Sequence, residues 1–213
     1  VNHAIDREAI VNKVLGGHAR ATNALTTPFH FAHEKDVTRY SYDPEKAKKL
    51  IAEAGYPDGF TVDFFFTRDE SVAEAIVAYL NEVGIKTILH FKDKWRELYQ
   101  EMIAGNTPLV FVASGGYSIP DASAILDLYF PLKSPRCFGS TREIDTLLAT
   151  AAASNDDTIR KESLSQAQKL IAKEAFWTPL YYGNSVTAMK KHLKFKPDYD
   201  EIDRYFTASW EEN

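Results

Sequence analysis

The chain contains 213 residues, of which 45% are hydrophobic and 13% aromatic, enough to bury a sizeable core as one domain or a closely joined pair. Its 25 basic and 30 acidic residues give a formal net charge of -5 at pH 7. Both signs are interspersed, so no basic stripe indicates nucleic-acid binding. The longest apolar runs, such as Leu109–Ala113, are far shorter than the roughly 20 residues of a membrane-spanning helix.

The N-terminus has no basic start followed by an apolar stretch, so no secretion signal is visible. The chain instead enters a helical pattern at once, at Asp6–Leu15, and we expect it to begin at a domain boundary. The stretch His18–Ser41 has no sustained period, which predicts a long irregular crossing segment on the surface. The single cysteine, Cys137, can form neither an internal disulfide nor a thiolate metal site.

The clearest local pattern is a helix that Asp43 caps and Gly55 ends, with Pro44 in its first turn. Helical and strand patterns then alternate, which predicts an α/β layer with helices covering a sheet. The expected elements are strand Phe60–Phe66, helix Glu70–Val83, strand Ile85–Phe91, helix Asp93–Ala104 and strand Leu109–Ala113.

The loop after this last strand is the most site-like in the chain. It reads Ser114-Gly115-Gly116-Tyr117-Ser118-Ile119-Pro120-Asp121, a glycine-rich turn before a short helix that Asp121 could cap. Further along we expect helices at Arg142–Ala153 and Thr158–Ala175, and paired strands at Trp177–Tyr182 and Val186–Met189.

Tests for chemistry in these motifs are negative. The Gly115-Gly116 turn matches neither GxGxxG nor GxxxxGK[ST], and no lysine follows it, so a tight turn that lets a ligand or a partner lobe approach is the better interpretation. Ser114 lacks the G-x-S-x-G context of a serine hydrolase. His30 and His33 have metal-ligand spacing, but they have no nearby cysteine or carboxylate pattern beyond the adjacent Glu34. We expect no catalysis, no metal and no cofactor.

Large amphipathic rings near strand ends are better candidates for ligand contact. Core packing is the favoured interpretation for Trp177 and Tyr99. Packing and ligand contact remain open for Trp95, Tyr117 and one of Tyr181 or Tyr182.

Several segments in a fixed order carry a family resemblance: AIDREAIV at residues 4–11, YDPEKAKKLIAEAGYPDGF at 42–60, NEVGIK at 81–86, DTLL at 145–148 and FWTPLYY at 176–182. They resemble the extracytoplasmic solute-binding proteins of ABC importers for peptides and nickel, bacterial extracellular solute-binding family 5. The resemblance implies a periplasmic-binding-protein-like lobe with a central mixed sheet flanked by helices. Residues 1–213 would then form the second α/β lobe of a two-lobed protein, without its first lobe.

The resemblance also implies where ligand would bind. WRELY at residues 95–99 is similar to the family's EWxxY element, so Trp95 falls where peptide binders often present a ring. The family's next element, GWxxDYx(D/E)P, carries a carboxylate for the peptide amine, whereas residues 113–120 read ASGGYSIP. A gapless alignment places Ser114 at the tryptophan and Tyr117 at the carboxylate, and a slip of one residue places Gly116 there.

Since no acid stands at that position, a peptide with a free amine would need another one, such as Asp121, or a group on the first lobe. Nickel is also disfavoured, because no histidine follows the proline of this loop. The open turn suits a bulkier or differently charged solute. The expected ligand-binding residues are Trp95, Ser114, Gly115, Gly116, Tyr117, Asp121 and Tyr182.

The resemblance implies a non-catalytic binding component of a peptide, oligopeptide or nickel importer, which closes on a small-molecule or peptide-like solute between two lobes. Its partners would be its own N-terminal lobe and an ABC permease in the membrane, with no nucleic acid. It would be periplasmic or extracellular, with a lipoprotein anchor. The alternative is the ligand-sensing lobe of a transcriptional regulator, which a winged-helix segment before this lobe would indicate. An enzyme is a third, weaker interpretation.

Overall fold

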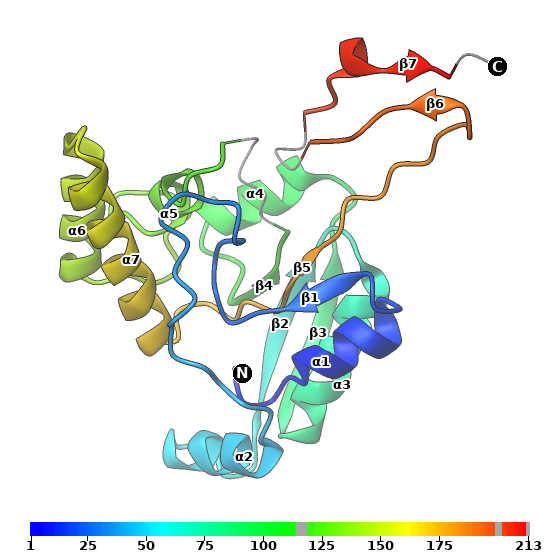
Figure 1. Ribbon diagram of the computed structural model, residues 1–213. Coiled ribbons are helices and arrows are strands. Elements are labelled where there is room, and N and C mark those ends of the chain that lie inside the picture. Colours follow the sequence, from blue (N-terminus) through cyan, green and yellow to red (C-terminus); the bar gives the residue numbers. More distant parts are fainter. Residues whose placement is uncertain (114–118, 199–201, 212–213) are drawn as a thin grey trace.

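A parallel three-stranded sheet lies at the centre of the computed structural model, which describes residues 1–113, 119–198 and 202–211 (Figure 1). The strand order is β3-β2-β4, with β2 at Phe60–Phe66, β3 at Ile85–Phe91 and β4 at Leu109–Phe111. The expected bounds of β2 and β3 are confirmed, whereas β4 is two residues shorter than predicted. All pairings within this sheet are parallel, and the antiparallel pairings of the described chain lie in two separate two-stranded sheets.

Helices cover both faces of this sheet, as expected for an α/β lobe. Because side chains alternate along a strand, Phe64 and Phe66 of β2 face one core and Phe65 faces another. The first core includes Ile76 and Leu80 of the helix α3. The helices on this side are α1 (Arg7–Ala9), the π-helix η1 (Ile10–Val14), α2 (Pro44–Glu53) and α3 (Glu70–Glu82), while α4 (Trp95–Ile103) covers Phe65 with Leu98 and Met102.

A second group of helices forms its own core beside the sheet (Figure 1). It consists of α5 (Ser123–Tyr129), α6 (Arg142–Ala153) and α7 (Asp157–Lys173), and the predicted bounds of α6 are confirmed. Tyr129 and Phe130 are 1% and 0% exposed, and the ring of Trp177 packs on them with centroid separations of 4.8 and 5.4 Å. Trp177 therefore packs against this core as expected, although it is itself only partly buried.

The segment between the first helix and α2 forms a strand that the sequence did not predict. Ala19–Ala21 makes β1, which pairs antiparallel with β5 (Tyr181–Gly183), in the register Arg20 opposite Tyr182. The predicted pairing of 177–182 with 186–189 is wrong, because β5 takes its partner from residues about 160 positions earlier and residues 186–189 form no strand. Local periodicity cannot reveal such a distant partner.

Polar contacts hold the next part of this segment on α7. The amide of Gln168, 1% exposed, donates to the carbonyl of Ala32 at 2.8 Å, and its oxygen accepts from the Thr26 hydroxyl at 2.9 Å. Thr26 and Ala32 are themselves buried. The expectation of a segment confined to the surface is therefore wrong at these residues, because their polar groups find partners inside the fold.

Glu34 makes a second anchor on the same helix. Its carboxylate accepts a short hydrogen bond from the Ser165 hydroxyl and pairs with Lys169 at 3.1 Å. Burial alone raises the pKa of Glu34, but the hydrogen bonds from Ser165, the Asp36 amide and Lys169 lower the pKa from 4.5 to about 2. The ionised form is thus the one that holds this segment on α7.

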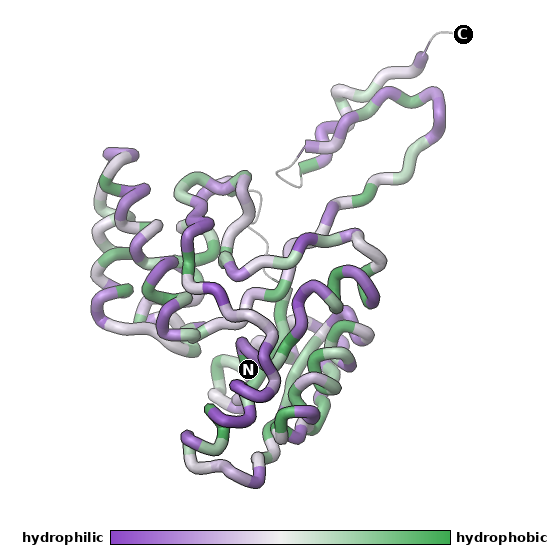
Figure 2. Tube along the Cα trace, turned by 60° about the horizontal axis from the view of Figure 1, so that its bottom comes forward, coloured by the Kyte–Doolittle hydropathy of each residue, from purple (hydrophilic) through white to green (hydrophobic). Residues whose placement is uncertain are grey.

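The C-terminal part of the described chain extends away from the rest of the molecule (Figures 1 and 2). It carries β6 (Leu193–Lys194), a 3-10 turn at Tyr205–Thr207 and β7 (Ser209–Trp210), with β6 and β7 antiparallel. Hydrophobic and hydrophilic residues alternate along it (Figure 2). Across the described residues, no helix has both the length and the apolar character needed to cross a bilayer.

Candidate functional site

The parallel sheet brings three connections to one edge. The carboxyl ends of β2, β3 and β4 point the same way, so the residues that follow them lie along a common border. Asp69 follows β2, Trp95 follows β3, and Ala113 follows β4. In open α/β sheets, ligands bind in the crevice outside the carboxyl ends of the strands. Topology therefore marks this edge as a candidate site.

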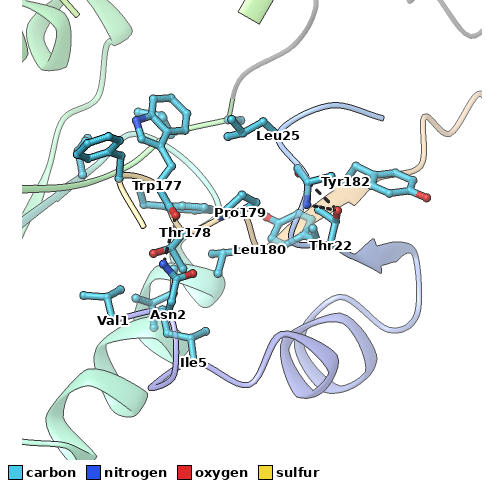
Figure 3. Close-up of a pocket in the computed structure, with 18 of the residues that line it drawn as sticks. Val1, Asn2, Ile5, Thr22, Leu25, Trp177, Thr178, Pro179, Leu180 and Tyr182 are labelled. Carbon is cyan, nitrogen blue, oxygen red and sulfur yellow. Dashed lines mark hydrogen bonds between the residues drawn. The ribbon is translucent and has the colours of Figure 1, made fainter. Parts of the chain in front are cut away.

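A cavity of about 1580 Å³ opens beside this sheet (Figure 3). It is larger than the roughly 300–1,000 Å³ of a typical small-molecule pocket. Most of the side chains that line it are apolar. Much of the wall comes from the N-terminal residues 1–5, part of the segment 22–30, the β4 region 107–113 with Ile119 and Pro120, and residues 175–185. Further lining residues come from α2, β2 and α3, and others are Tyr40, Asp69 and Asp198.

The buried guanidinium of Arg7 joins three of the segments around the cavity. Arg7 is 6% exposed, and its Nε donates to the carbonyl of Pro179 at 2.7 Å. Its terminal nitrogens donate to the carbonyl of Asn2 at 3.1 Å, to the Asn2 side-chain oxygen at 2.7 Å and to the carbonyl of Tyr40 at 3.3 Å. The amide of Asn2 in turn donates to the carbonyl of Trp177 at 3.3 Å.

Burial lowers the pKa of Arg7, and the partners given above for its guanidinium are all neutral oxygens. The arginine of the AIDRE motif thus holds together residues of the cavity wall without lining the cavity itself. Figure 3 shows Asn2 of this wall against residues 177–180.

At the other end of this wall, β5 brings two tyrosines to the cavity. Tyr181 and Tyr182 both line it and both are partly buried. Burial, and then the negative charge of Asp69, raise the pKa of Tyr181 to about 12, so its hydroxyl stays protonated at neutral pH. Thr22 continues the wall, because its amide donates to the carbonyl of Leu180 at 3.1 Å.

The predicted site residues are only partly brought together. Tyr182 lines the cavity, but Trp95 does not. Trp95 is 39% exposed at the start of α4, where its ring stacks on Tyr99 at 6.3 Å between centroids. Ser114, Gly115, Gly116 and Tyr117 lie outside the described residues.

Asp121 also stands apart from the cavity lining. One of its carboxylate oxygens pairs with Arg160 at 2.5 Å, and the other accepts from the amide of Ser123 at 2.9 Å, at the start of α5. The ion pair with Arg160 balances the negative charge of Asp121 inside the fold. The hydrogen bond from Ser123 agrees with the expected help at a helix N-terminus, although Ala122 occupies the N-cap position itself.

Sequence reasoning missed Asp69, which lines the cavity. Its position immediately before α3 and just beyond the carboxyl end of β2 was a usable signal, since parallel-sheet proteins place ligands there.

The two histidines with metal-ligand spacing contact hydroxyl groups. His30 lies 2.9 Å from the Thr27 hydroxyl, and His33 lies 3.0 Å from the Thr26 hydroxyl. In the part of the chain that the structure describes, no group of three His, Cys, Asp or Glu side chains is placed to hold a metal ion.

Comparison with known proteins identifies the family. Residues 1–134 match the model of bacterial extracellular solute-binding proteins, family 5 middle region, and the chain belongs to this family. The proteins of this family are transport components and not enzymes.

Individual relatives resemble almost the whole chain. It is 28% identical over 206 residues to the glutathione-binding protein GsiB of Salmonella choleraesuis, which covers 91% of this chain and 40% of that protein. It is 28% identical over 210 residues to heme-binding protein A of Haemophilus influenzae, covering 91% of this chain and 37% of that one. The chain thus spans about two fifths of the length of these curated relatives.

Among solved structures, the periplasmic binding protein DppA from Helicobacter pylori, in complex with the peptide STSA, has a TM-score of 0.85 and 25% identity. The match covers 99% of this chain and 43% of that structure. HbpA2 from Haemophilus parasuis also has a TM-score of 0.85, at 21% identity. These likenesses confirm the fold of a periplasmic-binding-protein lobe.

Proposed function

We propose that this chain is one lobe of a two-lobed solute-binding component of an ABC importer, of the class that handles peptides and peptide-like solutes. The observation that carries the proposal is the large, mostly apolar cavity beside a parallel sheet, in a chain that belongs to solute-binding family 5. The chain covers about two fifths of its curated relatives, which supports a second lobe as the missing half of the cleft. Residues 1–213 would act as a single lobe.

The proposed mechanism is capture by closure. A solute would rest against the apolar wall of residues 175–182 and the β4 edge, and the partner lobe would then cover it. Closure would shift an existing equilibrium between open and closed forms, by as much as the solute prefers the closed one. Burial of apolar solute surface contributes about 25 cal/mol per Å², so the affinity would rise with the apolar area that closure removes from water.

The ligand contacts predicted from the sequence belong to this proposal. Tyr182 lies in the cavity wall, and Trp95 stands at the same carboxyl edge, on α4. Ser114, Gly115, Gly116 and Tyr117 would complete the rim, whereas Asp121, paired with Arg160, would support the rim without contacting the solute. The loaded protein would deliver its solute to a membrane permease, outside the cytoplasm, from a periplasmic or lipoprotein-anchored position.

Thermal unfolding of the complete gene product that carries this chain tests the proposal. The panel should contain dipeptides, tripeptides, glutathione, haem, an opine, a nickel chelate and a manno-oligosaccharide. A true ligand at about 100 times its Kd adds about 2.7 kcal/mol to the free energy of unfolding, and we expect the largest rise in Tm from a peptide or peptide-like solute. A rise with the oligosaccharide alone, or no rise with any compound, would contradict the proposed class.

A further inference from the structure

Acidic side chains outnumber lysine and arginine side chains along the described cavity wall. Among the described residues that line the cavity, the acidic side chains are Asp69 and Asp198, and no lysine or arginine is present. Asp198 is already paired with Arg204, at 2.8 Å. Asp69, by contrast, takes part in none of the ion pairs of the described chain. A negative cavity attracts positively charged groups.

The side chain of Asp69 does not cap the helix that follows it. It occupies the N-cap position of α3 but makes no cap hydrogen bond, whereas Asp43 and Asp156 cap α2 and α7 with their carboxylates. Its backbone is left-handed, with φ 54° and ψ 51°, a conformation that costs most residues about 1–2 kcal/mol and that aspartate tolerates better. Across the described residues, its carboxylate takes part in no hydrogen bond or ion pair given by the structure.

Tyr181 lines the same cavity as Asp69. The charge of Asp69 raises the pKa of the partly buried Tyr181 hydroxyl, after the larger effect of burial. The protonated phenol of Tyr181 adds a hydrogen-bond acceptor to the cavity wall.

We propose that Asp69 is the anionic contact for a cationic group of the solute, either an α-ammonium or a side-chain ammonium or guanidinium. This inference rests on the proposed function and names the charge class of its solute. A cation transferred out of water without a partner is costly. Asp121, the acid expected from the sequence to compensate it, already pairs with Arg160. Asp69 therefore supplies, from the end of β2, a charge that the turn after β4 lacks.

Calorimetric titration of the complete gene product tests this inference with two matched probe pairs. The first pair is tri-alanine and N-acetyl-tri-alanine, which differ in the α-ammonium. The second is N-acetyl-Ala-Lys-Ala and N-acetyl-Ala-Met-Ala, which differ in a side-chain ammonium. We expect the wild type to bind the cationic member of at least one pair about 10- to 100-fold more tightly, the range for a charge-assisted hydrogen bond. The pair that responds identifies the source of the cation.

Two variants remove the charge of Asp69 while keeping a residue that accepts the left-handed backbone: Asp69→Asn and Asp69→Gly. Both should lose the preference for the cationic probe and leave the affinity for its neutral partner unchanged. Asp58→Asn removes the same charge from an exposed loop outside the cavity lining, and it should keep the preference. The Tm of each variant without ligand checks that it is folded. One folded Asp69 variant is enough for the test.

The inference is overturned if the wild type binds both members of each pair equally, or if the Asp69 variants keep the preference. Either result leaves the proposed function standing, because the peptides still bind. If the wild type binds none of the four probes, the peptide class itself is refuted, and the inference is refuted with it.

Discussion

Replacing Arg7 by methionine should destabilise the protein more than any exposed substitution. Methionine has a similar length but no donors, so the four hydrogen bonds of 2.7–3.3 Å to Asn2, Tyr40 and Pro179 are lost. Each bond to a charged donor contributes about 1.5–3 kcal/mol. Desolvation of the guanidinium, which is 6% exposed, offsets a large part of that sum. We expect the free energy of unfolding to fall by about 3–5 kcal/mol, because the oxygens of Asn2, Tyr40 and Pro179 lose this donor and each buried acceptor left unsatisfied costs about 1–3 kcal/mol.

Urea denaturation measures this loss as a lower midpoint at an unchanged m-value. Arg7→Lys keeps the charge but not the planar fork of donors, so its loss should be smaller, about 1–3 kcal/mol. Arg39→Met is the matched control, since Arg39 is exposed in the same crossing segment and should change stability by less than about 0.5 kcal/mol. If Arg7→Met were as stable as Arg39→Met, Arg7 would not hold the three segments together.

Two further predictions follow from local geometry. The pKa of Glu34 is about 2 in the folded chain against 4.5 ordinarily, so its contribution is present above pH 4.5 and is lost as the pH falls towards 2. After a discount for solvent screening this is about 1–2 kcal/mol, and Glu34→Gln should remove that part of the acid sensitivity; an unchanged acid profile in urea titrations would contradict it. A Cβ at Gly59 (φ +77°) would lie 2.0 Å from the carbonyl oxygen of Gly84, whereas one at Gly55 (φ +93°) meets nothing within 4 Å. Gly59→Ala should therefore cost at least about 2 kcal/mol more than Gly55→Ala, and equal unfolding midpoints would refute the clash.

The cavity and the charge of Asp69 change what the sequence suggested about the ligand. The turn after β4 carries no acid, which argued against solutes with a free amine. The structure places a different carboxylate on the cavity wall, from the end of β2. If Asp69 binds the cation, the protein still has an acidic ligand contact. The contact then comes from the end of β2 and not from residues 113–120.

Elements whose signals are local were predictable. Asp43 and Gly55 bound α2 as expected, because capping and a left-handed stop depend on a few neighbouring residues. The bounds of β2, β3 and α6 also agree, because a run of β-branched and aromatic residues or a helical period defines each one. The family resemblance rested on similar short segments, and the family model confirms it.

The sequence by itself determined the family and the α/β class, since each depends on contiguous residues, whereas the parallel direction of the three central strands came from the structure. Tertiary structure alone decided the partner of β5, the burial of Arg7 among backbone carbonyls, and the position of Asp69 on a cavity wall. It also showed that Asp121 is held by Arg160. The physical reason is the same in each case: these contacts join residues far apart in the chain, and a charge becomes a ligand contact or a structural one according to which distant group lies beside it.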